Sequence, residues 1–234
     1  MNYAIIAAGE GSRLVQEGIK KPKPLVELNG EPMIGRLIKI FTRCNAESVS
    51  VIVNAEMTEV RQYLESLNIG IPLNLVVKST PSSMHSFFEL SRVMPHGKFC
   101  LTTVDTIFRE NDFAGYINAY ESIVDGSCDG MMAVTPFVDD EKPLYVGVDD
   151  DMWVKGFYDE RQEDSRFISG GVYALGDNAV KVLEECMANG VSRMRNFQRA
   201  MIVSGLKLKA YSIDKIVDVD HAGDIATAEA FIKG

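Results

Sequence analysis

Hydrophobic positions along this chain follow two different spacings, and the two alternate regularly over its first half. Short continuous runs of β-branched and small apolar residues indicate strands that are buried on both faces. Between these runs, apolar residues recur every three or four positions, which is the spacing of the buried face of a helix. The strands predicted here are Asn2–Ala7, Ser48–Val53, Leu73–Val77 and Phe99–Val104, and the helices are Met33–Thr42, Met57–Leu67, Met84–Met94 and Phe113–Ser122. Strands that alternate with helices predict βαβ units and a parallel sheet.

The second half of the chain contains additional strands. A buried strand is predicted at Gly130–Pro136, and a loop follows at 139–143. Two apolar segments, Leu144–Val148 and Met152–Phe157, are joined by three aspartates and indicate a hairpin. The remaining predicted elements are a strand at Phe167–Leu175 interrupted by two glycines, helices at Asn178–Asn189, Met194–Ser204 and His221–Lys233, and short strands at Leu206–Ile213 and Ile216–Val219. We therefore predict a single α/β domain over residues 1–234, with a β-rich insertion at about 136–170.

The composition is that of an ordinary soluble domain, with 46% hydrophobic and 24% charged residues in a chain of 234. A net charge of −9 argues against binding to nucleic acid or to an anionic membrane, because both would repel it. No apolar run approaches the length of a membrane span. The four cysteines are widely spaced, which suits reduced thiols in the cytoplasm better than disulfides or a zinc site. We therefore expect a cytoplasmic protein that binds neither membrane nor nucleic acid.

Against this acidic background, cations gather behind a glycine loop close to the N-terminus. Gly9 and Gly11 follow the first predicted strand, and without a Cβ they allow a turn and a close approach of the backbone to a ligand. The cations are Arg13, Lys20, Lys21 and Lys23. A strand that leads into such a loop is suited to hold a polyphosphate. The spacing lacks the third glycine of a dinucleotide fingerprint and the Gly-Lys-Ser/Thr of a Walker A loop, which disfavours a dehydrogenase or flavodoxin-like domain and a P-loop NTPase.

Two segments of this region resemble a known family. Ala7-Ala-Gly-Glu-Gly-Ser-Arg13 and Pro22-Lys-Pro-Leu25 are similar to the signature of nucleotidyltransferases that join an NTP to a sugar 1-phosphate, or to a similar phosphate, and release pyrophosphate. The order of motifs along the rest of the chain also matches, so the resemblance covers nearly all of it. It implies a Rossmann-like, three-layer α/β/α fold with a mostly parallel mixed sheet.

The resemblance implies roles for the glycine loop and its cations. Arg13 would bind the β- and γ-phosphates, which become the leaving pyrophosphate, and Lys23 would bridge the α-phosphate and the attacking phosphate. Pro22 and Pro24 restrict the backbone on both sides of Lys23. The segment expected to cradle the nucleotide comprises Ala7, Ala8, Gly9, Gly11 and Ser12.

Two aspartates are expected to hold Mg²⁺, which prefers carboxylate and phosphate oxygens. Asp105 follows a buried strand, where open α/β sheets bind ligands, although the family usually has Gly-Asp and this chain has Val104-Asp105. Asp220 matches the family's second metal ligand, just before the last helix. Strand alternation places Asp218 on the same face as Asp220, so the choice between these two stays open.

The base and the acceptor are expected to contact other segments. Ser83 and His85 occupy the turn that contacts the base or ribose in the family, although that turn has no glycine here. Ser169, Gly170 and Gly171 match a family segment whose backbone contacts the acceptor sugar. Lys155, in the hairpin, is a candidate for the acceptor phosphate.

We therefore predict a Mg²⁺-dependent enzyme that transfers a nucleoside monophosphate from an NTP to a sugar 1-phosphate and releases pyrophosphate. One alternative is a cytidylyltransferase that acts on phosphocholine or another alcohol phosphate. Another is a regulatory protein that binds nucleotide without turnover, and the set of Arg13, Lys23, Asp105 and Asp220 argues against it. The sequence leaves the base, the acceptor and the oligomeric state open, with a homo-oligomer among the options.

Overall fold

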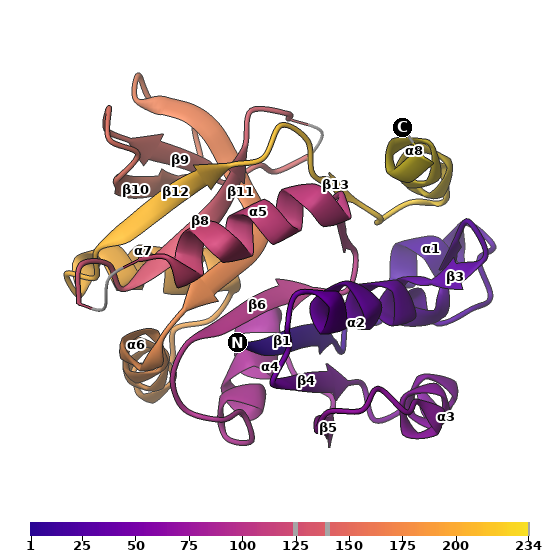
Figure 1. Ribbon diagram of the computed structural model, residues 1–234. Helices are drawn as coiled ribbons and strands as arrows, with labels where there is room; N and C mark the ends of the chain where they lie inside the picture. Colours follow the sequence, from indigo (N-terminus) through magenta and orange to yellow (C-terminus); the bar gives the residue numbers. More distant parts are fainter. Residues whose placement is uncertain (124–125, 139–140, 234) are drawn as a thin grey trace.

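The computed structural model describes residues 1–123, 126–138 and 141–233. Over these residues a nine-stranded mixed sheet forms the middle layer, with helices on both faces (Figure 1). This is the three-layer α/β/α arrangement that the sequence predicts. The loop predicted at 139–143 lies partly outside the described residues.

The sheet runs in the order β10-β9-β11-β6-β1-β4-β5, and β8 pairs with both β11 and β12. Strands β6, β1, β4 and β5 are mutually parallel, whereas β11 is antiparallel to β6. The strands are β1 (Asn2–Ala7), β4 (Ser48–Val53), β5 (Leu73–Val77), β6 (Phe99–Thr103), β8 (Gly130–Thr135), β9 (Tyr145–Val148), β10 (Val154–Tyr158), β11 (Ser165–Leu175) and β12 (Leu208–Ser212). The carboxyl ends of the four parallel strands therefore meet at one edge.

The side chains of β1 alternate between two hydrophobic cores. Tyr3 and Ile5 belong to one core, and Ala4 and Ile6 belong to the other. The first core is covered by α2 (Met33–Arg43), α3 (Thr58–Ser66), α5 (Glu110–Glu121) and α8 (Ala222–Lys233). The second is covered by α4 (Ser83–Ser91), α6 (Asp177–Ala188) and α7 (Met194–Val203). A strand buried on both faces needs no polar side chain, which explains the apolar run at the start of the sequence.

The predicted hairpin is present as β9 and β10, which pair antiparallel. It extends the central sheet through β11, so the β-rich segment predicted at 136–170 continues the same sheet. The pairing of β11 with β8 shifts register between Ser169 and Tyr173, where Gly171 has a φ of 72°. The hydroxyl of Tyr116 donates to the carbonyl of Met131 and accepts from the amide of Ala174, both at 2.6 Å, and so ties β8 to β11.

The long predicted elements are all present, with ends shifted by a few residues. Several short elements were not predicted, because a run of two to five residues shows no period. They are α1 (Ser12–Gln16), a 3₁₀ turn at Lys23–Leu25, the hairpin of β2 (Glu27–Leu28) and β3 (Glu31–Pro32), and β7 (Thr106–Ile107), which pairs with β13 (Val217–Asp218). In the described part of the chain, no helix is long and apolar enough to cross a bilayer.

Candidate active site

A cleft with a volume of about 660 Å³ opens at the carboxyl end of β1. The loop after β1 forms one wall, with Ala8, Gly9 and Gly11 on the surface of the cleft. Gly11 has φ 64° and ψ 30°, a left-handed conformation that L side chains rarely adopt, and it directly precedes α1. Leu14 anchors α1 in the core at 1% exposure. The glycine loop is therefore held between a central strand and a packed turn of helix.

Lys23 packs directly against this loop. It begins the 3₁₀ turn between Pro22 and Pro24, and it is only 8% exposed. A Cβ added to Gly11 would lie 2.8 Å from the Cβ of Lys23. The two sequence motifs, separated along the chain, thus form one wall of the cleft.

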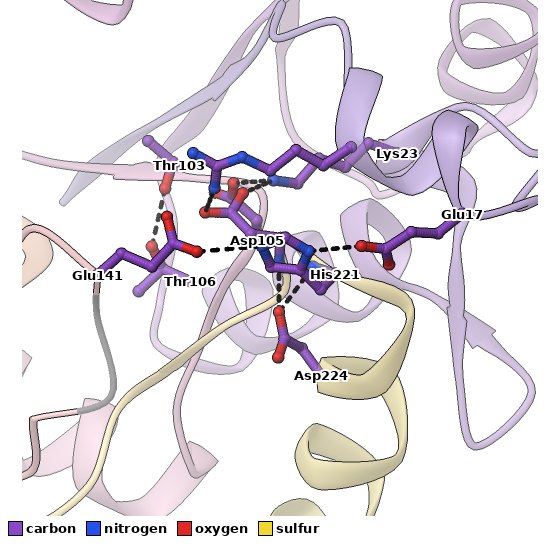
Figure 2. Close-up of polar contacts among 10 residues, drawn as sticks. Glu17, Lys23, Thr103, Asp105, Thr106, Glu141, His221 and Asp224 are labelled. Carbon is purple, nitrogen blue, oxygen red and sulfur yellow. Dashed lines mark hydrogen bonds and ion pairs between the residues drawn. The ribbon is translucent and has the colours of Figure 1, made fainter.

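Lys23 joins the two aspartates predicted as metal ligands. Its Nζ forms an ion pair with Oδ2 of Asp105 (Figure 2). The same Nζ lies 2.7 Å from Oδ1 of Asp220. Arg13 Nη1 lies 3.0 Å from the other carboxylate oxygen of Asp220. Four of the predicted site residues therefore meet at one point of the cleft.

Burial and charge oppose each other at this point. Burial alone would lower the pKa of Lys23, but the charges of Asp105 and Asp220 and its hydrogen bonds to them hold that pKa above its ordinary value. Burial likewise opposes ionisation of Asp220, but Lys23 and Arg13 keep its pKa below the usual range. Both groups are therefore charged at neutral pH.

The pairing of β7 with β13 brings Asp105 and Asp220 together from distant parts of the sequence. The amide of Val219 donates to the carbonyl of Asp105 at 3.1 Å, and Asp218 pairs with Thr106. Val219 is fully buried, whereas Asp218 and Asp220 both reach the cleft side, as alternation predicts. Asp220 forms ion pairs with both Lys23 and Arg13.

The donor set suits Mg²⁺. The carboxylates of Asp105 and Asp220 both contact the single Nζ of Lys23, so their oxygens lie close to one another. Mg²⁺ is commonly held by one or two carboxylates together with phosphate oxygens of the substrate. No cluster of three or more His, Cys, Asp or Glu side chains suited to a metal occurs in the described ranges, so ligands beyond these two carboxylates would come from phosphates and water.

A second cavity of about 350 Å³ opens next to the first. The two cavities share Ser83, Thr103, Asp105 and Asp220 on their walls. The second cavity is further lined by polar groups of β11 and α7, among them Ser169 and Gln198, whose side chains hydrogen-bond at 3.1 Å. The aspartates thus stand at the junction of two chambers.

The other predicted residues divide into those on the cleft and those away from it. Ser12, Ser83, Ser169 and Gly171 line one or both chambers. Ala7 is buried below the loop at 1% exposure. Like Ala7, three further predicted residues are not among the lining of either chamber, namely His85, Gly170 and Lys155.

Each of these three residues has another contact. His85 Nδ1 lies 2.8 Å from the hydroxyl of Ser82, at the start of α4. A Cβ on Gly170 would lie 2.4 Å from Cδ1 of Ile216, so this glycine permits close packing behind the chamber. Lys155 lies on β10, with its Nζ 3.9 Å from Asp149. Their predicted contacts with substrate stay predictions.

Comparisons with known proteins identify the family of this chain. A sequence model of the MobA-like NTP transferase domain matches residues 3–147. The chain belongs to this family. The matched range contains the glycine loop, Lys23 and Asp105, whereas Asp220 and most of the second chamber lie beyond it.

Curated relatives of this NTP transferase domain are partial matches. Over 42 residues this chain is 43% identical to the glucose-1-phosphate cytidylyltransferase of Salmonella typhimurium. The matched stretch covers 18% of this chain and 16% of the relative. Over 113 residues this chain is 28% identical to the 2-aminoethylphosphonate cytidylyltransferase of Lancefieldella rimae. That match covers 47% of this chain and 44% of the relative. The matches therefore span less than half of either relative.

Solved structures match this chain over almost its whole length. The inositol-1-phosphate CTP transferase from T. maritima has a TM-score of 0.80 at 16% identity, covering 99% of this chain and 96% of its own. A Bacillus anthracis protein assigned as a glucose-1-phosphate thymidylyltransferase has a TM-score of 0.84 at 17% identity, covering 98% and 94%. The CTP:phosphocholine cytidylyltransferase of Streptococcus pneumoniae has a TM-score of 0.73 at 18% identity, covering 98% and 97%. At these identities the likeness establishes the fold.

The sequence did not identify Asn54, which follows β4 and lines the first chamber. Its amide donates to the carbonyl of Ala8 at 3.4 Å, and its carbonyl accepts from the hydroxyl of Ser79 at 2.8 Å. It thereby joins the glycine loop to the segment before α4. The sequence did contain one indication of this role, because Asn54 follows a predicted parallel strand and such sheets bind ligands at the carboxyl ends of their strands. Arg193 and Gln198 were also missed, because α7 shows only a helical pattern in the sequence.

Proposed function

We propose that this protein is a Mg²⁺-dependent nucleotidyltransferase that transfers a nucleoside monophosphate from an NTP to a phosphorylated acceptor. The observation that best supports this is the meeting of two chambers at Asp105 and Asp220, with Lys23 between the carboxylates. A transferase that joins two phosphorylated substrates needs a site for each and concentrated charge where they react. The first chamber, beside the glycine loop, would take the NTP, and the second would take the acceptor.

The reaction requires one bond to form and one to break. An oxygen of the acceptor's phosphate attacks the α-phosphorus of the NTP, the bond from that phosphorus to the bridging oxygen breaks, and pyrophosphate leaves. The attacking phosphate is already anionic, so no side chain has to remove a proton. Lys23 would exchange its carboxylate partners for oxygens of the α-phosphate, and Arg13 would stabilise the leaving pyrophosphate. Mg²⁺ held by Asp105, Asp220 and phosphate oxygens would neutralise charge and align the reacting groups.

CTP is the NTP that we propose as donor. The names of the Salmonella typhimurium and Lancefieldella rimae relatives both specify cytidylyl transfer, and two of the three solved structures carry CTP in their names. For the acceptor we propose a sugar 1-phosphate, supported by the hydroxyl and amide groups of Ser169 and Gln198 in the second chamber. An alcohol phosphate such as phosphocholine is the second candidate, favoured by the shape shared with the Streptococcus pneumoniae enzyme. We place this activity in the cytoplasm, which the four free thiols support.

A panel of NTPs and acceptors tests the proposal. Purified protein with Mg²⁺ is assayed for pyrophosphate with CTP, UTP, GTP, dTTP or ATP against glucose 1-phosphate, inositol 1-phosphate, 2-aminoethylphosphonate and phosphocholine. We expect release with CTP, and loss of turnover in Asp105→Asn but not in the control Asp112→Asn, which lies in the first turn of α5 and lines neither chamber. If folded protein binds CTP and releases no pyrophosphate with any acceptor, the catalytic proposal fails and a regulatory nucleotide-binding role takes its place.

A further inference from the structure

The second chamber carries positive charge that the transfer reaction itself does not require. Asp105 and Asp220 mark the end where the α-phosphate would react. Three cationic side chains, Lys142, Arg193 and Arg195, also line this chamber. In the proposed reaction, Lys23 and the metal ion already bind the phosphate that attacks the NTP. The additional cations therefore need a separate explanation.

Arg195 already has partners in the protein. Its Nη1 lies 2.5 Å from Oδ1 of Asp159, and its Nη2 donates to the carbonyl of Lys142 at 3.0 Å. Arg199 holds the other carboxylate oxygen of Asp159 at 2.8 Å. Arg195 thus joins α7 to the loop after β10 and to the segment before β9. Its guanidinium is already engaged by protein partners, and its role is to fix the wall of the chamber.

Arg193 is different. It is exposed, and its side chain forms no hydrogen bond or ion pair with any residue in the described ranges. Its backbone has φ 72° and ψ 137°, outside the regions that L residues favour, and its carbonyl is held by the amides of Asn196 and Phe197. The guanidinium therefore stands beside the chamber with its five donors available to a ligand.

We propose that the acceptor carries a second anionic group, a carboxylate or a further phosphate, and that Arg193 binds it. This inference rests on the proposed transferase function and narrows the class of its acceptor. A guanidinium binds a carboxylate or phosphate through two parallel hydrogen bonds, so Arg193 would select for such a group. The positive charge of a choline group would be repelled at this end of the chamber. Tyr173 is the only aromatic residue among the described lining, which offers little to a quaternary ammonium.

Two matched pairs of acceptors test this inference. Phosphoserine and phosphoethanolamine differ by one carboxylate, and 3-phosphoglycerate and glycerol 3-phosphate differ by the oxidation of one carbon to a carboxylate. With CTP and Mg²⁺, we expect kcat/KM to be about ten- to a hundredfold higher for the carboxylated member of a pair. Arg193→Ala should remove that preference by lowering kcat/KM for the carboxylated member to about the value of its partner. Arg166→Ala, an exposed arginine of β11 paired with Asp150 and absent from the chamber lining, is the matched control and should keep the preference.

Calorimetric binding of the same four acceptors, with a non-hydrolysable CTP analogue present, separates the two proposals. Tighter binding of the carboxylated members that depends on Arg193, without pyrophosphate release, would refute the transferase function and retain the anion site. Turnover in which neither pair shows a preference, or in which Arg193→Ala weakens both members equally, would overturn the anion site and retain the transferase. Equal binding within each pair, with no turnover, would overturn both.

Discussion

Gly11 and Lys23 lie so close together that a Cβ on Gly11 would be 2.8 Å from the Cβ of Lys23. The glycine also has a φ of 64°, so it meets two separate requirements. Its conformation turns the chain after β1, and its missing side chain leaves room for the lysine to pack against the loop. The glycine motif and the lysine motif of the sequence therefore depend on each other for their position.

Replacing Gly11 by alanine should destabilise the protein by about 2 kcal/mol, because the left-handed conformation costs about 1 kcal/mol and the contact with Lys23 adds a comparable amount. Urea unfolding measures the difference. Turnover should also fall, since relief of the contact displaces Lys23 from Asp105 and Asp220.

Two other glycines separate these contributions. Gly18 has a φ of 91° but no atom within 4 Å of an added Cβ, so Gly18→Ala should show the conformational cost alone. Gly9 has neither a left-handed φ nor a neighbour within 4 Å, so Gly9→Ala should leave the free energy of unfolding almost unchanged. If Gly11→Ala is no more destabilising than Gly18→Ala, the contact with Lys23 has no energetic weight.

Replacing Lys23 by methionine should lower kcat/KM by about a hundred- to a thousandfold, the range found when a single group that stabilises transition-state charge is removed. Methionine keeps much of the length of the side chain and removes its charge. A pyrophosphate-release assay measures the effect.

Lys21 provides the control for this variant. Its Nζ pairs with Glu27 at 2.5 Å on the surface, with 57% of its side chain exposed, so Lys21→Met should change turnover little. Equal losses in the two variants would mean that the cations act only through the general electrostatic attraction of substrate.

The sequence predicted the long elements of the fold because each carries a clear period and a buried face. It could not predict β7, which is two residues long, or the pairing of β7 with β13 across more than a hundred positions. That short pairing is what brings Asp220 to Asp105. The motif order along the chain implied the meeting of these aspartates, but local spacing did not.

The same reasoning explains which site residues were found. Arg13 and Lys23 belong to compact motifs with unusual composition, so they were visible in the sequence. Asn54 and Arg193 each stand alone next to an ordinary strand or helix, and only the tertiary arrangement shows that they line the chambers. Alternation put Asp218 and Asp220 on one face and could not choose between them, whereas the ion pairs with Lys23 and Arg13 favour Asp220.

Asn54→Ala should raise the KM for the NTP by about tenfold while changing kcat much less. The side chain is only 8% exposed, and it bonds the carbonyl of Ala8 and the hydroxyl of Ser79, so its loss frees both walls of the first chamber. Steady-state kinetics with the NTP varied give both constants. Asn74→Ala removes a comparable bond, 3.2 Å to the hydroxyl of Ser50, away from the chamber, and should leave KM unchanged. An equal change in KM for the two variants would contradict a role for Asn54 in positioning the loop.

The contact between Glu17 and His221 should make stability depend on pH. Nδ1 of His221 lies 2.6 Å from one carboxylate oxygen of Glu17 (Figure 2). The amide of Ala222 donates to the other oxygen at 2.6 Å. The hydrogen bond that His221 donates to Glu17 raises the pKa of His221, and the bonds from Ala222 and His221 lower the pKa of Glu17. The contact therefore ties the end of α1 to the start of α8, beside Asp220.

A raised histidine pKa stabilises the fold fully below the unfolded value of about 6.5, and that contribution is lost as pH rises through the folded value. The lowered glutamate pKa contributes above its unfolded value of about 4.3 and is lost as pH falls below it. The melting temperature of wild type should thus exceed that of Glu17→Gln most between about pH 5 and 6.5, and by less at pH 8.5, where the charge of His221 no longer contributes. The side chain of His96 is 99% exposed, so His96→Gln is the control. Its melting temperature should equal that of wild type at every pH. A difference between wild type and Glu17→Gln that is constant from pH 5 to 8.5 would show that His221 is not charged in the folded protein.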